Sequence, residues 1–377
     1  MRASIVAIVC GVSSSGVLAQ ASVSNVTIDG YGQINHGVMV SDTAAGTKTY
    51  TADNDNSATR AGFHVKADIE GTGLSVGSHV ELEYQVNPSN VVNEDRRTVS
   101  GEFTERHLNI FVAGAFGKVS VGQGDGAANG NIEQDLSGTA VISYANPALI
   151  GAGLNFVDES NGASQSFGSV MSNNDFESRY TRVRYDLPKF GPVQLAVSQG
   201  TKTSSDVDVI TDLVTGEVSS STSYDSRDIT ELSARFSGEL GGGKMIGALG
   251  YSSADIGGAA DKLDTIGGSV SWLHGSGVNL TAGYSQVEDD NAANPDSDFY
   301  LVKVGYKTGK HAMDIHMMES NDRVLEGDSA TTVGVGYVYS PVSYFSAYAG
   351  YNNNTLDRDA GDYEDVNTLF VGGLLKF

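Results

Sequence analysis

Hydrophobic and polar residues alternate with a period of two along most of the chain from Val26 onward. This period is typical of β-strands, whose side chains point to opposite faces in turn, and no long stretch has the 3.6-residue period of a helix. A soluble β-sandwich has the same alternation, so the period by itself does not separate a sandwich from a barrel. The segment Ala58–Glu70 carries apolar residues on one face and charged ones on the other: Ala61, Phe63, Val65, Ala67 and Ile69 against Arg60, His64, Lys66, Asp68 and Glu70.

The pattern predicts sixteen strands, an even number, as single-chain barrels of bacterial outer membranes have. Two of them flank a long gap between Gly124 and Ser178. The expected strands are Val26–Val40, Ala58–Glu70, Leu74–Val86, Glu105–Ala113, Lys118–Gly124, Ser178–Asp186, Val193–Gly200, Ser223–Ser237, Lys244–Ser252, Lys262–Leu273, Val278–Val287, Phe299–Tyr306, Ala312–Glu319, Thr331–Tyr339, Tyr344–Tyr351 and Thr368–Phe377.

The connections between these strands alternate between short and long. Short ones such as Gly71–Gly73 and Leu187–Pro192 contain glycine or proline, the residues that form tight turns. Long polar ones such as Ser41–Ser57 and Asn352–Asn367 stand between them. Short turns at one rim and long loops at the other favour an all-β fold, a closed transmembrane antiparallel barrel, over a sandwich with crossing connections. The long acidic loops would then face the cell exterior.

The first residues have the features of an export signal. Arg2 precedes a short apolar stretch, and Ala19-Gln20-Ala21 is a small-x-small cleavage site, which predicts a signal peptide over 1–21 and a mature chain that starts at Ser22. Residues 22–377 would form a single barrel domain. The one cysteine, Cys10, belongs to the removed part, so no disulfide or thiol chemistry is expected. The net charge of −23 argues against a nucleic-acid partner.

Several motifs resemble the general porins of Gram-negative bacteria, particularly the alphaproteobacterial branch. They are Gly32-Gln33-Ile34-Asn35, the run from Gly114 to Gln123, the stretch from Asp125 to Thr139, Arg182-Val183-Arg184-Tyr185-Asp186, and the terminal Phe377. The resemblance implies an outer-membrane porin: a water-filled channel for passive diffusion of small hydrophilic solutes and ions. It also implies a homotrimer surrounded by outer-membrane lipid and lipopolysaccharide, and a third loop, about 125–177, that folds inward and narrows the lumen. Gln123 departs from the family, since many general porins carry arginine there.

A porin constriction needs basic groups on the wall and acidic groups on the loop. Alternation along the strand places Arg60, His64 and Lys66 on the lumen side. Arg182 and Arg184 also belong to the polar face of their strand, which places them on the lumen side too. The side to which Arg106 points is ambiguous, because strict alternation puts it on the same face as the apolar Leu108, Ile110 and Val112. The loop candidates are Asp125, Glu133 and Asp135, for which solvated turn residues are an equally good interpretation.

The acidic excess predicts a preference for cations. Acidic pairs in the outer loops (Asp289-Asp290, Asp296/Asp298, Asp357/Asp359 and Glu364-Asp365) could bind Ca²⁺ or Mg²⁺ loosely, although solvated loop charge explains them better. No motif indicates a cofactor or a catalytic centre, so we do not expect an enzyme. A substrate-selective channel is the nearest alternative; a barrel enzyme or an adhesin is more remote.

Overall fold

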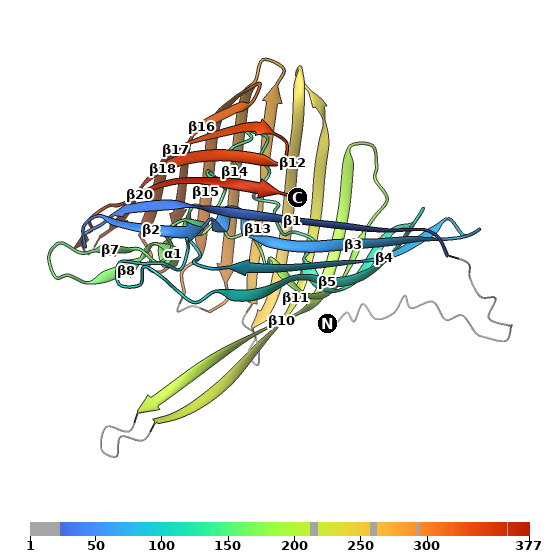
Figure 1. Ribbon diagram of the computed structural model, residues 1–377. Helices are drawn as coiled ribbons and strands as arrows, with labels where there is room; N and C mark the ends of the chain where they lie inside the picture. Colours follow the sequence, from blue (N-terminus) through green and yellow to red (C-terminus); the bar gives the residue numbers. More distant parts are fainter. Residues whose placement is uncertain (1–22, 212–217, 257–261, 292–293, 360) are drawn as a thin grey trace.

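The structure is a computed structural model that describes residues 23–211, 218–256, 262–291, 294–359 and 361–377. The predicted signal peptide and its cleavage site between Ala21 and Ser22 lie outside these residues. Within them, eighteen strands belong to one sheet; β2 and β19 are short additions, and the other sixteen form a closed wall (Figure 1). No helix in the described part of the chain is long and apolar enough to cross a membrane.

The wall strands are antiparallel to their neighbours and follow chain order around the ring. Their bounds are β1 (Val23–Asp42), β3 (Arg60–Ile69), β4 (Leu74–Gln85), β5 (Glu102–Gly114), β6 (Gly117–Asp125), β9 (Arg179–Asp186), β10 (Val193–Thr211), β11 (Val218–Leu240), β12 (Gly243–Ile256), β13 (Lys262–His274), β14 (Val278–Asp289), β15 (Ser297–Thr308), β16 (His311–Asn321), β17 (Ser329–Val342), β18 (Phe345–Arg358) and β20 (Val366–Lys376). The remaining elements are β2 (Lys48–Asp53), β7 (Asn155–Val157), β8 (Ser164–Ser166), β19 (Gly361–Asp362), α1 (Phe167–Val170) and the 3₁₀ turns η1 (Asp55–Ser57) and η2 (Pro147–Leu149).

The first and last strands close the ring. Residues 33–42 of β1 pair with residues 367–376 of β20, and the backbone amides of Gly32 and Phe377 donate to each other's carbonyl oxygens at 2.8 and 2.9 Å. Closure leaves no open sheet edge along the seam, which is what a sheet in hydrocarbon requires. The prediction of sixteen antiparallel strands is confirmed.

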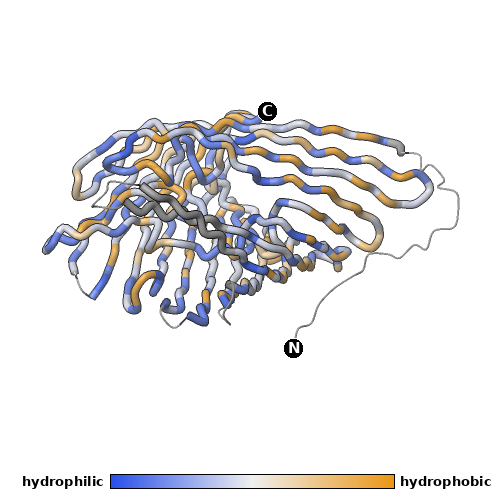
Figure 2. Tube along the Cα trace, turned by 90° about the horizontal axis from the view of Figure 1, so that it is seen from below, coloured by the Kyte–Doolittle hydropathy of each residue, from blue (hydrophilic) through white to orange (hydrophobic). Residues whose placement is uncertain are grey.

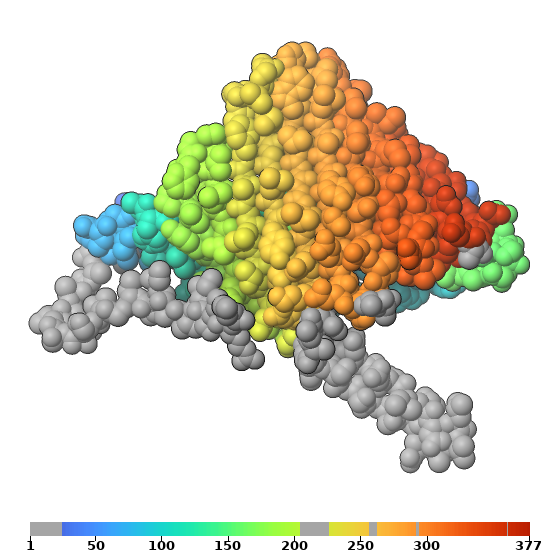
Figure 3. Space-filling model, turned by 180° about the vertical axis from the view of Figure 1, so that it is seen from behind, coloured from blue at the N-terminus to red at the C-terminus, as the bar shows by residue number. Residues whose placement is uncertain are grey.

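The two faces of the wall differ in the way the alternation predicts. In β15, Tyr300, Val302 and Val304 are 45–58% exposed, whereas Lys303 between them is 1% exposed. Hydrophobic and hydrophilic residues also alternate along many of the strands drawn in Figure 2. Viewed from behind, the strands of the C-terminal half form a continuous surface (Figure 3). The exposed apolar face is the outer one, and the polar face lies inside.

Three strands extend further than their sequence pattern indicates. β10 and β11 continue as a paired ribbon through Thr211 and from Val218, where we expected a loop over Thr201–Thr222. β18 reaches Arg358, and β2 lies inside the expected loop Ser41–Ser57. Antiparallel pairing continues through these extensions, because it depends on backbone hydrogen bonds and not on an apolar side chain at every second position.

A glycine pair at the seam offers a test of closure. Gly37 of β1 pairs with Gly372 of β20, and a Cβ on Gly37 would lie 2.4 Å from the carbonyl oxygen of Val371. We expect Gly37→Val to cost about 1–3 kcal/mol through overpacking and to lower the yield of refolded barrel, measured as the heat-modifiable band on a gel. Gly30→Ala in the same strand, where nothing lies within 4 Å, is the matched control. An equal yield for both variants would contradict this account of the seam.

Candidate functional site

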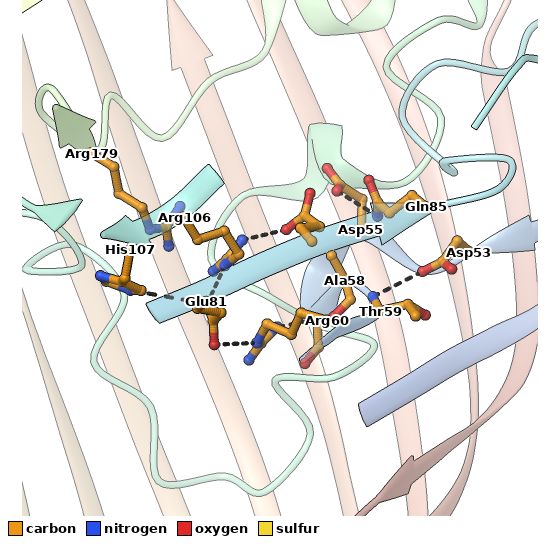
Figure 4. A network of polar contacts seen from close by, with 12 residues as sticks. Asp53, Asp55, Ala58, Thr59, Arg60, Glu81, Gln85, Arg106, His107 and Arg179 are labelled. Carbon is orange, nitrogen blue, oxygen red and sulfur yellow. Dashed lines mark hydrogen bonds and ion pairs between the residues drawn. The ribbon is translucent and has the colours of Figure 1, made fainter. Parts of the chain in front are cut away.

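A network of charged side chains lies on the inner face of β3, β4 and β5. Glu81 of β4 is its centre: the Arg60 Nε lies 3.3 Å from the Glu81 Oε2, and the Arg106 Nε lies 2.6 Å from the Glu81 Oε1. Arg106 also reaches Glu83 through Nη1 at 2.5 Å. Figure 4 shows Arg60, Arg106 and His107 around Glu81. Charge-assisted bonds of this kind are short and hold the side chains in place.

A β-bulge explains why Arg106 belongs to this network. Glu81 pairs with His107, but the next residue, Leu82, pairs with Glu105, so Arg106 is an extra residue in β5. An extra residue lets two successive side chains face the same side of a strand. Arg106 and His107 therefore both face inward, while Leu108 beyond them is 54% exposed on the outer face. The ambiguous parity of Arg106 in the sequence has this cause.

A column of stacked rings crosses the inner wall beside the network. His64 stacks on His79 with ring centroids 4.0 Å apart, His79 stacks on His107 at 4.1 Å, and Tyr31 of β1 extends the column at 5.3 Å from His64. The Tyr31 hydroxyl donates to the Glu81 Oε2 at 2.7 Å, which joins the column to the charged network. His64 lies on the inner wall, as its parity indicates; His79 and His107 were not among the predicted wall residues.

The remaining predicted wall residues lie in two other places. Lys66 is 54% exposed and pairs with Asp68 at 3.5 Å. Arg182 donates from Nε to the Asp125 carbonyl at 2.9 Å and from Nη1 to the Gly122 carbonyl at 2.7 Å. Arg184 donates from Nη1 to the Gly126 carbonyl at 2.7 Å. These two arginines thus hold the backbone where β6 leaves the wall.

Residues 126–178, here called the third-loop segment, connect β6 to β9 and bond to the polar faces of many wall strands. The Ala128 amide donates to Glu231 of β11 at 3.0 Å, and the Gln134 amide donates to Ser269 of β13 at 2.9 Å. The Ser285 hydroxyl of β14 donates to the Asn173 carbonyl at 2.9 Å. Buried apolar side chains of the segment, including Leu154, Phe156 and Phe167, pack in one core with wall residues such as Phe299 and Phe370. Its apolar stretch Ala152–Val157 contributes to β7, which pairs with β8 in a small hairpin.

The three predicted loop acids have different surroundings. Asp125, at the end of β6, is 39% exposed at its side chain and pairs with Arg179 at 3.0 Å. Asp135 is 9% exposed and pairs with the buried Lys303 of β15 at 2.8 Å. Glu133 accepts from the Tyr144 hydroxyl and, at 3.0 Å, from the Asn173 amide. Sequence patterns did not indicate Arg179 or Lys303, because each contact depends on how distant segments meet.

Glu133 and Asp175 form an acidic pair in the third-loop segment. Burial raises the pKa of the Glu133 carboxyl above its ordinary value. Burial also raises the pKa of the Asp175 carboxyl, and the nearby Glu133 charge adds to that shift. The Gly130 amide donates to the Asp175 Oδ1 at 2.8 Å. Both carboxyls therefore keep their protons to a higher pH than exposed acids do.

A cavity of about 670 Å³ separates the charged wall from this acidic pair. Arg60, Arg106 and Arg179 line it from the wall side, and Glu133 and Asp175 line it from the third-loop segment. Glu83 and Glu102 lie on the same side as the arginines, so the wall side carries paired charges of both signs. Titration of Glu133 and Asp175 then sets how much negative charge faces this wall across the polar space.

Metal binding at the outer loops remains a prediction. In the described residues, no group of three or more histidine, cysteine, aspartate or glutamate side chains could hold a metal ion. Asp289, one of the predicted loop acids, accepts from the Asn291 amide at 2.9 Å and from the Asn294 side-chain amide at 2.8 Å.

Comparisons with known proteins agree with the architecture. A family model described as Gram-negative porin matches residues 3–359. No curated protein sequence matches the chain. Solved structures of several outer-membrane proteins are similar to this one, three of which follow. The anion-selective porin from Comamonas acidovorans has 14% identity and a TM-score of 0.63, with 94% of this chain and 100% of that chain covered. OmpT of Vibrio cholerae, an outer-membrane protein solved as a loop L8 deletion mutant, has 15% identity and a TM-score of 0.58, covering 93% and 99%. The outer-membrane channel DcaP of Acinetobacter baumannii has 14% identity and a TM-score of 0.58, covering 94% and 98%.

Proposed function

Because the chain belongs to the Gram-negative porin family, it is an outer-membrane channel protein, and we propose that its third-loop segment and charged network make it a cation-preferring general porin. Small hydrophilic solutes and ions would diffuse through the water-filled lumen. The family and the fold indicate a channel rather than an enzyme. The single observation that carries the proposal is the cavity whose opposite sides bear Arg106 and Glu133.

The proposed narrowing of the lumen draws support from the partners of the third-loop segment. Its polar groups bond to β11, β13 and β14, and on another side of the ring the Asn54 side chain donates to the Val141 carbonyl at 2.8 Å. The Ser89 hydroxyl, which follows β4, donates to the Leu149 carbonyl at 2.7 Å. A single segment with these partners would cross the space that the ring encloses. It would leave the cavity beside Arg106 as the passage.

The proposed cation preference is supported by the charge of the long connections. The connections after β16 and β18 carry Asp322, Glu326, Asp328, Asp359, Asp362, Glu364 and Asp365 against Arg323. Such a rim concentrates cations at the mouth and repels anions, most strongly at low salt. The Comamonas porin is described as anion-selective, so the shared fold does not decide the sign.

The deciding experiment is planar-bilayer conductance of the refolded mature chain in a potassium chloride gradient. We expect open channels with a reversal potential of the sign that K⁺ preference gives. Stepwise openings in groups of three would support the proposed homotrimer. A reversal potential of the opposite sign would contradict cation preference, and a saturable block by one sugar or amino acid would favour the substrate-selective alternative.

The pH dependence of selectivity provides a second test. The pKa of Glu133 and the pKa of Asp175 are raised, so both groups are neutral at low pH and lose their protons above the ordinary carboxyl range. Raising the pH through that window adds negative charge to the passage, and we expect the K⁺/Cl⁻ permeability ratio to increase. Glu133→Gln should flatten this increase, as measured by reversal potentials at several pH values. Asp68→Asn, at an exposed pair elsewhere on the wall, should leave it unchanged.

The proposal includes export of the chain and its surroundings in the outer membrane. The leader 1–21 would be removed between Ala21 and Ser22, and intact-mass measurement of protein purified from outer membranes tests this. The barrel would contact outer-membrane lipid and lipopolysaccharide, with Ca²⁺ or Mg²⁺ bound loosely by the acidic loops.

A further inference from the structure

A second cavity, of about 430 Å³, lies at the rim where the strands are joined by short turns. Its lining includes the turn between β9 and β10 and the ends of β6, β9 and β11. Four basic residues line it, Lys118, Arg184, Lys189 and Arg235, with one carboxylate, Asp186. The chain as a whole has a net charge of −23, so this local excess of positive charge runs against the composition.

The single carboxylate does not balance these cations. Asp186 is shared between Arg184, at 2.8 Å from Nη2, and Lys118, at 3.6 Å from Nζ. Among the described residues, no carboxylate pairs with Lys189 or Arg235. Arg235 donates from Nε to the Asn131 side-chain oxygen at 2.7 Å and from Nη2 to the Asn129 carbonyl at 2.6 Å. These neutral acceptors hold the guanidinium in place, and in the described part of the chain no carboxylate forms an ion pair with it.

From this geometry we propose that the cavity is a binding subsite for phosphate-bearing solutes on their way through the channel. The proposal rests on the proposed channel function, which brings solutes to this rim. Basic groups approach the cavity from three strands and one turn, as a tetrahedral anion with several oxygens requires. The larger cavity differs from it, because Glu81 and Glu83 neutralise Arg60 and Arg106 there.

The subsite also gives the channel two ends of opposite character. The long connections after β16 and β18 are acidic, whereas the short turns carry Lys189 and Lys310. A phosphate that has passed the narrow part would meet positive charge at the far rim. Weak binding there raises the local concentration of phosphate and still lets it leave the channel. Conduction through a binding site requires binding that is weak enough for the solute to leave.

The test uses inorganic phosphate as the probe and the purified full barrel in detergent. Phosphorus NMR line broadening, titrated at neutral pH and constant ionic strength, should show saturable binding to the wild type. The double variant Lys118→Gln, Lys189→Gln should bind roughly tenfold more weakly, since it loses two nearby charges. The matched control Lys244→Gln, Lys310→Gln removes two charges outside the cavity lining and should bind as the wild type does.

The outcomes separate the subsite from the channel. Equal loss of binding in both double variants, or no saturable binding to the wild type, would overturn the subsite. Conductance in potassium chloride, measured on the same preparations, tests the channel independently, because no variant touches the charged network around Glu81. Conduction without saturable phosphate binding overturns the subsite alone; saturable binding lost in the Lys118, Lys189 variant supports it.

Discussion

Asp135→Asn should increase single-channel conductance and expose the third-loop segment to protease. Asp135 pairs with Lys303, which is 1% exposed, at 2.8 Å, and Lys303 also donates to the Ser143 carbonyl. Removing one partner of a buried ion pair costs about 3–5 kcal/mol, because the other charge stays buried without compensation. We expect the protein to avoid that cost by releasing the segment from β15, which widens the passage. Bilayer recordings and limited proteolysis measure the two effects.

Two variants test whether the buried pair is the cause. Asp135→Asn combined with Lys303→Met removes both charges, so conductance and protease resistance should return toward the wild-type values. Asp68→Asn breaks an exposed pair with Lys66 and should change little, since such pairs contribute about 0–1 kcal/mol. If the double variant is as open as Asp135→Asn, the unpaired charge is not what releases the segment.

Arg106→Gln should raise the K⁺/Cl⁻ permeability ratio about fivefold. A unit charge at 4 Å contributes about 1 kcal/mol in a water-like dielectric, which corresponds to that factor. The substitution takes a positive charge from the cavity wall and leaves Glu81 and Glu83 without their main counter-ion. Reversal potentials in a salt gradient measure the ratio, and the heat-modifiable gel band verifies that the barrel has folded.

Three further variants test whether the charge of Arg106 causes the expected change in permeability ratio. Arg106→Lys keeps the charge and should stay near the wild-type ratio. Arg60→Gln, on the other side of Glu81, should shift the ratio in the same direction, and it covers the case in which the first variant folds poorly. Lys66→Gln removes a charge from the same wall, but at a 54% exposed position away from the cavity lining, and should have a small effect. Equal shifts for Lys66→Gln and Arg106→Gln would mean that overall wall charge, and not the cavity, sets selectivity.

The candidate site was partly predictable from sequence. Arg60 and His64 were placed on the inner wall because their strand keeps an unbroken period of two from Arg60 to Ile69. Arg106 could not be placed in this way, because the β-bulge opposite Glu81 turns its side chain to the other face of the strand. Such a bulge has no dependable signature in a single sequence. His79 shares the polar parity of Glu81 and could have been assigned to the wall. Its stacking on His64 and His107 required the pairing register as well.

The different surroundings of the acids in the third-loop segment could not be predicted from the sequence. Asp135 and Glu133 are two residues apart in a polar, irregular stretch. One nevertheless pairs with Lys303, 168 residues away, and the other faces the cavity. Nothing local distinguishes them, because both environments are created by strands that lie far away in the sequence.

The sequence alone therefore determined the alternating strands, their number, the closed ring and the two unlike rims. These follow from local physics: side chains alternate every residue, turns need glycine or proline, and a sheet in lipid cannot leave its edges open. The tertiary structure alone decided the register, the bulge at Arg106, the burial of Asp135 and the gathering of Lys118, Lys189 and Arg235 at one rim. Those features depend on which distant strands become neighbours. Electrostatic contacts between such strands produce no periodic pattern in the sequence.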